Sequence, residues 1–371
     1  MQRSPFQTMT TTAGKRKLHK ALLGWFDREQ RDMPWRKTGD PYPIWVSEIM
    51  LQQTQVKTVV PYYERWIKSF PTLDKLARSR EETVLKHWEG LGYYSRARNL
   101  HQAAKIVVKE HGGRVPDTYD ELIQLPGIGR YTAGAILSIA FDQAVPVLDG
   151  NVKRVLSRLF AIPGNGVPAA FENRLWETSA QLVPARRPGD FNQAMMELGA
   201  TVCLPKKPLC LPCPLQTSCE AQRRGEVEKF PAPKARARIK KIEVSAAVIT
   251  RKGKVYIQQR PHGGLMGGLW EFPGGKRLPK ETEEECLKRE IKEELGIPIV
   301  IAKKMMTVKH SYTQFRVTLN VFWCPWQSGR IRATQCEQWK WVRYEDLNRY
   351  TFPAANAKIV KTLLNHNGQF Q

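Results

Sequence analysis

The cysteines that could hold a metal are concentrated in one short stretch of the chain. Four of the seven cysteines follow the pattern C-x6-C-x2-C-x5-C, at Cys203, Cys210, Cys213 and Cys219. Four thiolates in one compact loop can close around one metal centre, and both tetrahedral zinc and an iron–sulfur cluster accept such a set. Only one CxxC pair occurs, whereas zinc knuckles usually present two. By itself this spacing leaves both centres open.

Two lysines, Lys206 and Lys207, lie between the first two cysteines. A loop closed by a metal would hold both cations in place, where they can contact phosphate. A lysine pair is more often ordinary solvated charge. A phosphate contact is therefore favoured only if the rest of the chain points to nucleic acid.

The charge of the chain does point that way. Lys and Arg total 59 against 35 Asp and Glu, which gives a formal net charge of +24 and a pI near 9.9. An excess of this size favours a polyanionic partner such as nucleic acid. Residues 1–17 are polar and no apolar run is long enough for a membrane span, so we expect a cytoplasmic, nucleoid-associated monomer without a membrane partner. A reducing compartment argues against disulfides and for a metal.

A tight turn between two helical patterns is predicted at Leu125-Pro126-Gly127-Ile128-Gly129. Gly127 and Gly129 let backbone N–H groups approach a phosphate closely, and the following helix adds its positive N-terminal end. This pattern is typical of a helix–hairpin–helix element, here at about 119–140. Any tight helical turn would share its composition.

Apolar spacing predicts two kinds of domain around these motifs. Residues 18–222 repeat at helical spacing and predict an all-α domain that follows a flexible tail at 1–17. Residues 223–241 are rich in Lys, Arg and Pro and predict a basic linker. In 242–371, two β-rich runs around Lys252-Gly253, a strand at 317–323 and a helix at 286–295 predict an α+β domain. The chain is thus expected to be multidomain.

An acidic motif that includes the helix at 286–295 matches every position of the Nudix box. It runs from Gly275 through Glu281 and Arg289 to Gly296. Leu287, Ile291 and Leu295 would be buried, which places three glutamates on the other face: Glu290, Glu293 and Glu294. Like charges at this spacing repel unless Arg289, solvent or a divalent cation such as Mg²⁺ compensates.

Several motifs, in order along the chain, resemble the endonuclease III superfamily of helix–hairpin–helix glycosylases. They are the hairpin, RYTAG at 130–134, VLDGNV at 147–152 and the four cysteines. WVSEIMLQQT at 45–54 and GLGYYSR at 90–96 are similar to the adenine DNA glycosylase (MutY) branch. The resemblance implies an all-α glycosylase domain with a 4Fe-4S loop at 203–219, and a Nudix-like domain that recognises oxidised guanine. The implied substrate is adenine mispaired with 8-oxoguanine or guanine in double-stranded DNA.

The resemblance assigns the chemistry to Glu48 and Asp149. Adenine leaves readily only when protonated, and the departing sugar becomes an oxocarbenium ion, so two carboxyls in opposite protonation states are needed. A helix through Glu48 would align it with Leu51, Gln52 and Gln55 on one pocket wall, where desolvation raises its pKa and keeps it a general acid. Asp149 would be the ionised group. Taken singly, a surface glutamate and an aspartate N-cap are the commoner roles.

The remaining site residues follow from the same resemblance. Tyr131 and Asn151 would support the carboxyls, and the adenine pocket would be lined by Arg31, Arg36, Leu51 and Gln193. DNA contacts fall on Gln53, Thr54 and Tyr93, of which Gln53 and Tyr93 would wedge into the base stack when the nucleotide flips. A lyase of this superfamily carries a lysine nucleophile where Tyr131 stands. Hydrolysis without strand cleavage is therefore implied, with a bifunctional glycosylase/lyase as the alternative.

The C-terminal domain departs from the family in two respects. The family's Nudix box has usually decayed, whereas an intact box here leaves open Mg²⁺-dependent hydrolysis of oxidised nucleoside triphosphates; an unused inherited motif is favoured. The loop that usually presents Phe-Ser-His to oxidised guanine reads Tyr312-Thr313-Gln314, with an amide in place of the imidazole. The strength of 8-oxoguanine preference stays open. A non-catalytic iron–sulfur DNA-binding module is a third reading, against which the carboxyl pair counts.

Overall fold

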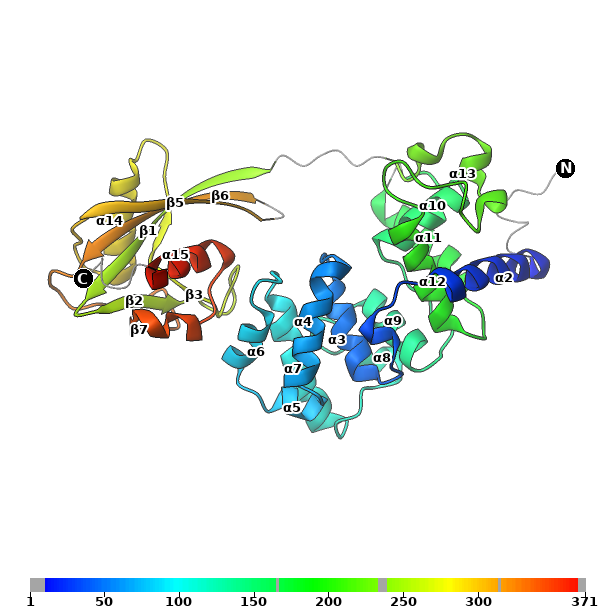
Figure 1. Cartoon of the computed structure of the whole chain (residues 1–371), viewed down its shortest axis with the longest axis horizontal. Coiled ribbons are helices and arrows are strands. Elements are labelled where there is room, and N and C mark those ends of the chain that lie inside the picture. Colours follow the sequence, from blue (N-terminus) through cyan, green and yellow to red (C-terminus); the bar gives the residue numbers. More distant parts are fainter. Residues whose placement is uncertain (1–10, 165–166, 233–238, 313–314, 366–371) are drawn as a thin grey trace. The chain divides into compact units, whose positions relative to one another are not determined.

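The computed structural model describes residues 11–164, 167–232, 239–312 and 315–365. The chain forms two compact units: Met1–Arg78 with Asn99–Ala235, and Ser79–Arg98 with Arg236–Gln371 (Figure 1). This division differs from the predicted domain limits in one respect, because residues 79–98 group with the C-terminal unit. The limits predicted from the sequence stay predictions.

The first unit is helical, as predicted, with no strand in the described residues 11–164 and 167–232. Its α-helices are α2 (Thr12–Glu29), α3 (Pro41–Leu51), α4 (Val56–Ser69), α5 (Leu73–Ala77), most of α7 (Ser95–Glu110), α8 (Tyr119–Leu122), α9 (Arg130–Ala140), α10 (Gly150–Leu159), α11 (Pro168–Leu182), α12 (Pro188–Thr201) and α13 (Glu220–Arg223). Short 3-10 turns are η1 (Pro34–Arg36), η2 (Gln216–Ser218) and η3 (Val227–Lys229).

The main core of this unit joins α2, α10 and α12. Fully buried residues from these helices, such as Leu22, Leu156 and Ala194, pack in one cluster. The cluster also contains Val152, three residues after Asp149. Burial of apolar side chains of this size is the dominant favourable term in folding. The N-terminus of α10 is therefore held by the core rather than by surface contacts.

Two segments of this unit are helical or packed where the sequence predicted a flexible tail and a linker. Residues 12–17, predicted to belong to a flexible tail, begin α2, because the Thr11 hydroxyl caps the helix by accepting from the Gly14 amide. The first part of the predicted linker packs on α10. There, Phe230 is buried, and the Arg158 guanidinium binds the carbonyl groups of Val227 and Phe230. Residues 233–238 of the predicted linker lie outside the described residues.

The segment around Glu48 is helical, but α3 ends earlier than a single helical face would require. Asp40 caps its start by accepting from the Tyr42 amide, and Pro41 occupies the first turn. The helix ends at Leu51, and Gln53 has a φ of 56° in the left-handed region. The predicted alignment of Glu48 with Gln52 and Gln55 on one helix is therefore wrong.

The second unit contains α6 (Glu81–Trp88) and a seven-stranded sheet: β1 (Lys240–Arg251), β2 (Lys254–Gln259), β3 (Trp270–Glu271), β4 (Gly274–Lys276), β5 (Lys303–Ser311), β6 (Phe315–Pro325) and β7 (Gln338–Arg343). The order is β3-β2-β1-β6-β5, with β4 also paired to β1 and β7 to β2. Among the strands that the structure describes, only β1 and β6 pair in parallel. Lys252 and Gly253 form the predicted hairpin turn, with φ values of 47° and 70°.

Two helices cover opposite faces of this sheet. Ala247 and Ile249 of β1 pack with α14 (Glu283–Leu295), whereas Ala246 and Val248 pack with α15 (Ala354–Asn365). The turn η4 (Tyr344–Arg349) precedes α15. A capping box between Thr282 and Glu285 starts α14, and Gly296, with a φ of 68°, ends it. The predicted α+β character is confirmed.

None of the described helices has the length and hydropathy needed for a bilayer span.

Candidate active site

Glu48 and Asp149 line the same cavity, which has a volume of about 910 Å³. Glu48 projects from α3 and Asp149 is the N-cap of α10. Tyr131, near the start of α9, and Asn151, in the first turn of α10, line this cavity as well. The four side chains that the resemblance placed at the chemistry therefore share one site, which three different helices supply.

Glu48 is an acid whose environment favours its protonated form. Its side chain is 5% exposed. Burial raises the pKa of Glu48 to about 7; the hydrogen bond from Tyr131 lowers it, and the charge of Asp149 raises it further. A carboxyl with this pKa can hold a proton near neutral pH and can also release it.

Tyr131 holds this carboxyl in place. Its hydroxyl donates to Glu48 Oε2 at 2.6 Å and lies 3.2 Å from the sulfur of Met196. Burial raises the pKa of Tyr131 well above its usual value, and the charge of Glu48 adds to the effect. The phenol therefore stays protonated and remains a donor.

Asp149 has a set of partners that favours the ionised form. Its carboxylate accepts from the Val152 amide at 2.7 Å and from Asn151 Nδ2 at 2.8 Å. Burial raises the pKa of Asp149, whereas these hydrogen bonds and the charge of Arg154 act in the opposite direction. The two carboxyls thus differ in their hydrogen-bond donors: a backbone amide and an Asn amide group for Asp149, and a phenol for Glu48.

Arg154 links Asp149 to the cysteine loop, and no motif in the sequence marks it. Its guanidinium donates to Asn151 Oδ1 at 2.9 Å, to the Gly199 carbonyl at 2.6 Å and to the Cys203 carbonyl at 2.7 Å. Asn151 in turn donates to Asp149. Gly199 leaves the room for this contact, since an added Cβ there would lie 2.6 Å from Asn151 Cβ.

The predicted adenine-pocket residues Arg31, Arg36, Leu51 and Gln193 all line the cavity. Sequence reasoning missed Glu197, a 1% exposed carboxylate that pairs with Arg31 at 2.6 Å and with Arg36 at 2.9 Å. Burial favours a higher pKa for Glu197, but the two arginines outweigh it and lower the pKa. Arg36 also donates to Gln193 Oε1 at 3.1 Å. The arginines are therefore fixed, and Glu197 offsets one of their two positive charges.

Four predicted DNA contacts of the first unit line the same cavity: Gln53, Thr54, Gly127 and Gly129. Gly127 has a φ of 81°, and an added Cβ would lie 2.8 Å from Asn99 Cβ, so glycine is required there. Gly129 has a φ of −107° and open space around it. It is the N-cap of α9 without a side-chain hydrogen bond, which leaves the helix start available for a phosphate.

The predicted DNA contacts of the second unit are described only in part. Tyr93 is 36% exposed and has a φ of 48°. Tyr312 is half-buried against the sheet core, and the centroid of its ring lies 4.5 Å from the centroid of the His310 ring. Thr313 and Gln314 lie outside the described residues.

The four cysteines line one small cavity of about 30 Å³ together with Arg158. Arg158 is 2% exposed. Its guanidinium donates to Cys203 Sγ at 3.3 Å and to the Leu204 carbonyl at 2.6 Å. Lys206 and Lys207 are exposed on the same loop. Among the residues that the structure describes, no three His, Cys, Asp or Glu side chains are close enough together to hold one metal ion.

The Nudix-box glutamates lie on α14, and most are paired with Arg289. Its guanidinium contacts Glu281 at 2.6 Å, Glu290 at 2.9 Å and Glu293 at 3.2 Å. Glu294 instead accepts from the Gly274 amide and from Gln258, both at 3.1 Å. Burial raises the pKa of Glu294 to about 7. In this arrangement the described glutamates do not form a group that could hold one metal ion.

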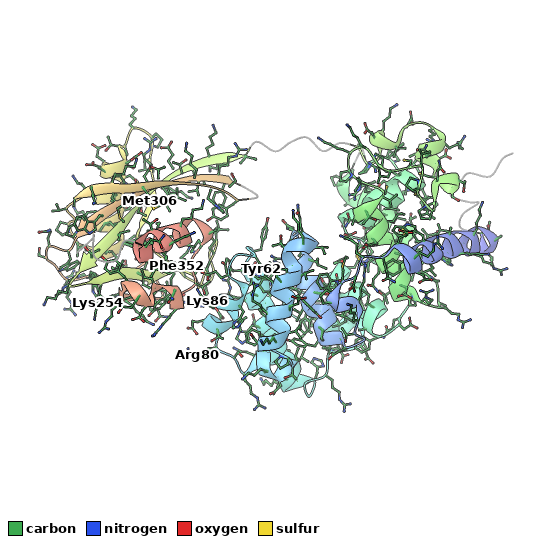
Figure 2. All side chains as sticks on the ribbon, in the orientation of Figure 1. Tyr62, Arg80, Lys86, Lys254, Met306 and Phe352 are labelled. Atoms are coloured by element: carbon green, nitrogen blue, oxygen red, sulfur yellow. The ribbon has the colours of Figure 1, made fainter. Side chains whose placement is uncertain are left out.

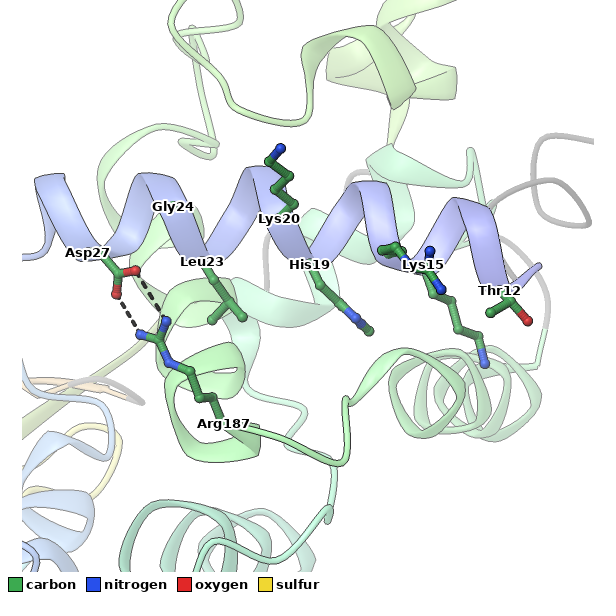
Figure 3. Close-up of a pocket in the computed structure, with 9 residues that line it drawn as sticks. Thr12, Lys15, His19, Lys20, Leu23, Gly24, Asp27 and Arg187 are labelled. Carbon is green, nitrogen blue, oxygen red and sulfur yellow. Dashed lines mark hydrogen bonds and ion pairs between the residues drawn. The ribbon is translucent and has the colours of Figure 1, made fainter.

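A second hollow in the first unit shares no lining residue with the catalytic cavity. It runs along α2, where Lys15, Arg16 and Lys20 make it basic (Figure 3). Arg187 reaches it from the start of α12 but is paired with Asp27. This hollow offers positive charge but no acid–anion pair.

Comparison with known proteins places this geometry in context. Residues 46–181 match the HhH-GPD superfamily of base excision DNA repair proteins, and residues 245–362 match the NUDIX domain. The adenine DNA glycosylase of Rattus norvegicus is 37% identical over 98% of this chain and 81% of its own length. That of Homo sapiens is 36% identical over 92% of this chain and 73% of its own length.

A bacterial relative and a solved structure extend the comparison. The adenine DNA glycosylase of Buchnera aphidicola subsp. Acyrthosiphon pisum is 37% identical over 81% of this chain and 84% of its own length. A thermostable thymine-DNA glycosylase of known structure is 31% identical, with a TM-score of 0.51, over 57% of this chain and 99% of its own length.

Proposed function

This chain belongs to the adenine DNA glycosylase family, and on that basis we propose that it hydrolyses the N-glycosidic bond of adenine mispaired with 8-oxoguanine or guanine in double-stranded DNA. One observation carries the proposal: the buried acid Glu48 and the hydrogen-bonded carboxylate Asp149 line a single cavity. We place the enzyme on nucleoid DNA in the cytoplasm and expect it to act as a monomer.

The first step is extrusion of the adenine nucleotide into the cavity. Flipping costs a few kcal/mol and costs least at a mispair. Side chains that enter the stack, here Gln53 and Tyr93, offset the stacking that is lost. Both residues have a left-handed backbone, so their side chains are oriented by a strained loop conformation rather than by a regular helix.

The second step is departure of adenine. Glu48 donates its proton to a ring nitrogen of the base as the bond between that base and the sugar carbon breaks, so the bonding pair leaves with a neutral adenine. Tyr131 keeps the Glu48 carboxyl oriented through their 2.6 Å hydrogen bond. Arg36 and Gln193, which line the cavity, would contact the edge of the base.

The third step is capture of the sugar cation by water. The Asp149 carboxylate stabilises the oxocarbenium ion, and Asn151 together with the Val152 amide holds that carboxylate in place. Water adds to the sugar carbon and its proton returns to the carboxylate of Glu48, which restores the acid. No lysine stands at the position of Tyr131, so the product is an abasic site in an intact strand.

An oligonucleotide assay tests this function. Duplexes with an 8-oxoguanine:A or G:A mispair should release adenine and break at the abasic site only after alkali treatment. Glu48→Gln and Asp149→Asn should abolish release, whereas Glu64→Gln, which changes an exposed carboxyl on α4, should leave it intact. Wild-type rates in either active-site variant would contradict the assignment. Strand cleavage without alkali would favour the bifunctional alternative.

For the opposite base, we propose that Tyr312, Thr313 and Gln314 contact 8-oxoguanine. The support is their position in the sequence, together with the half-buried ring of Tyr312. Because Gln314 supplies an amide where the family usually supplies an imidazole, Gln314→His should raise the preference for 8-oxoguanine:A over G:A. Equal rates on both duplexes in the wild type and in this variant would contradict the contact.

For the cysteine loop, we propose that Cys203, Cys210, Cys213 and Cys219 hold a 4Fe-4S cluster. All four thiols line one cavity beside the Arg158 guanidinium, a positive charge that favours thiolates. Tetrahedral zinc is the competing centre for four thiolates, and the resemblance of the chain to the endonuclease III superfamily favours the cluster. When bound, the cluster would tie the loop together and fix Lys206 and Lys207 for phosphate contact. Iron and sulfide analysis with visible absorption tests this assignment, and stoichiometric zinc would refute it.

For the Nudix box, we propose a structural role. Arg289 forms ion pairs with three of its glutamates, and Glu294 accepts from the Gly274 amide and so joins α14 to the sheet. We expect no Mg²⁺-dependent release of pyrophosphate from 8-oxo-dGTP. Release that Glu294→Gln abolishes would instead support the hydrolase alternative.

A further inference from the structure

The loop that carries Tyr93 belongs to the C-terminal unit, and contacts at both of its ends hold it there. At the first end, the amide of Phe352 donates to Glu89 Oε1 at 3.4 Å, and Lys86 Nζ donates to the Tyr350 carbonyl at 3.3 Å. Figure 2 labels Lys86 and Phe352. Lys86 and Glu89 also pair with each other at 2.6 Å. The end of α6 is thus bound to the chain between η4 and α15.

At the other end, the Arg98 guanidinium donates to the carbonyl of Gly267, in the connection between β2 and β3. A third contact joins the start of α6 to an earlier residue of the same connection, since His262 Nε2 lies 3.1 Å from Glu81 Oε1. Residues 89 and 98 therefore bracket Tyr93, and each is bound to a different part of the Nudix-like domain.

Between these two attachments the loop has little freedom. Gly90, Gly92 and Tyr93 have φ values of 100°, 72° and 48°. The Arg96 guanidinium donates to the carbonyl groups of Leu91 and Gly92, both at 3.2 Å, and Trp88 Nε1 donates to the Gly92 carbonyl at 3.1 Å. A tyrosine in the left-handed region persists only where its surroundings determine the backbone. A displacement at either attachment would therefore change the backbone position of Tyr93.

We propose that the Nudix-like domain positions Tyr93 for insertion into the DNA, through Glu89 and Arg98 as positioning residues. The inference rests on the proposed function, in which Tyr93 enters the base stack. It gives the C-terminal domain a role in base flipping besides contact with the opposite base. Sequence alone places these residues in different domains, so only the folded unit brings them together.

The test uses the full-length enzyme and a duplex with 2-aminopurine beside the mispaired adenine, whose fluorescence rises when the stack opens. Glu89→Ala and Arg98→Ala should each lower this rise and weaken binding to the mispair by about tenfold, because stacking of one aromatic ring on a base is worth 1–3 kcal/mol. Glu89→Gln keeps an oxygen that can accept from the Phe352 amide and should restore most of the rise. Asp74→Ala, which breaks an exposed ion pair with Arg78 away from the attachments, is the matched control.

A double-mutant cycle separates positioning from general stability. If Glu89 acts through Tyr93, the fluorescence rise should be reduced equally in Tyr93→Ala and in the double variant that also carries Glu89→Ala. Additive losses, or an unchanged rise in both attachment variants, would overturn the proposal. If Glu89→Ala does not fold, as judged by its thermal transition, Lys86→Met supplies a milder disruption of the same end and should give a smaller loss of the rise. Wild-type enzyme that opens the stack without releasing adenine would refute the proposed chemistry but leave this inference standing.

Discussion

Tyr131 donates a 2.6 Å hydrogen bond to the carboxyl group of Glu48, and this contact joins α9 to α3 inside the catalytic cavity. The two residues are 83 positions apart in the chain. The acid and the hydroxyl that holds it therefore meet only in the folded protein. The pH dependence of both rate and stability should follow from this pair.

The rate of adenine release should depend on the protonation of Glu48. Its pKa of about 7 means that the acid form dominates below neutral pH, so single-turnover rates should fall about tenfold per pH unit well above pH 7. Tyr131→Phe removes a hydrogen bond that lowers this pKa, so it should move the alkaline limb to higher pH. Tyr119→Phe, at an exposed tyrosine, is the control. An alkaline limb that stays in place in Tyr131→Phe would count against the assigned acid.

Stability should also depend on pH through Glu48. Its pKa in the folded protein lies above the usual value of 4.5 for a glutamate, so the folded state binds the proton more tightly than the unfolded state does. The resulting stabilisation is complete below pH 4.5 and disappears as the pH rises through about 7. Over that window the wild type should lose about 3 kcal/mol relative to Glu48→Gln. Chemical denaturation of both proteins from pH 4 to 8 measures the difference, and parallel curves would contradict it.

Arg154→Ala should impair catalysis although Arg154 does not line the cavity. Loss of its hydrogen bonds to Asn151 and to the Cys203 carbonyl would release both the partner of Asp149 and the first cysteine of the loop. Residues that orient ligands and catalytic groups typically contribute roughly 10–100-fold. We expect a loss of this size in single-turnover rate, with reduced iron content. Arg154→Lys should not restore it, because one ammonium cannot span the same acceptors. Arg174→Ala, an exposed arginine on α11, should leave rate and iron unchanged.

Binding of double-stranded DNA should weaken steeply with salt, in keeping with a net charge of +24. Each phosphate contact contributes about −0.9 to the slope of log K against log salt. Lys206→Ala with Lys207→Ala should therefore reduce the slope by up to about two. Lys15→Ala with Lys20→Ala removes the same charge from α2. An equal change in both double variants would show that total charge, rather than the cysteine loop, sets the slope.

Local sequence determined much of this protein. The order of the motifs placed Glu48, Asp149 and the four cysteines, apolar spacing predicted the helical and α+β parts, and Lys252-Gly253 marked its hairpin turn. These features depend on neighbours a few positions away, so they can be read along the chain.

The tertiary structure decided the rest. The burial that raises the pKa of Glu48 comes from other helices, the partner of Arg31 and Arg36 proved to be Glu197, and Arg154 joins Asp149 to Cys203. Residues 79–98 group with the C-terminal unit. Desolvation, ion pairing and left-handed backbone depend on contacts between distant segments, and no local pattern encodes which distant groups will meet.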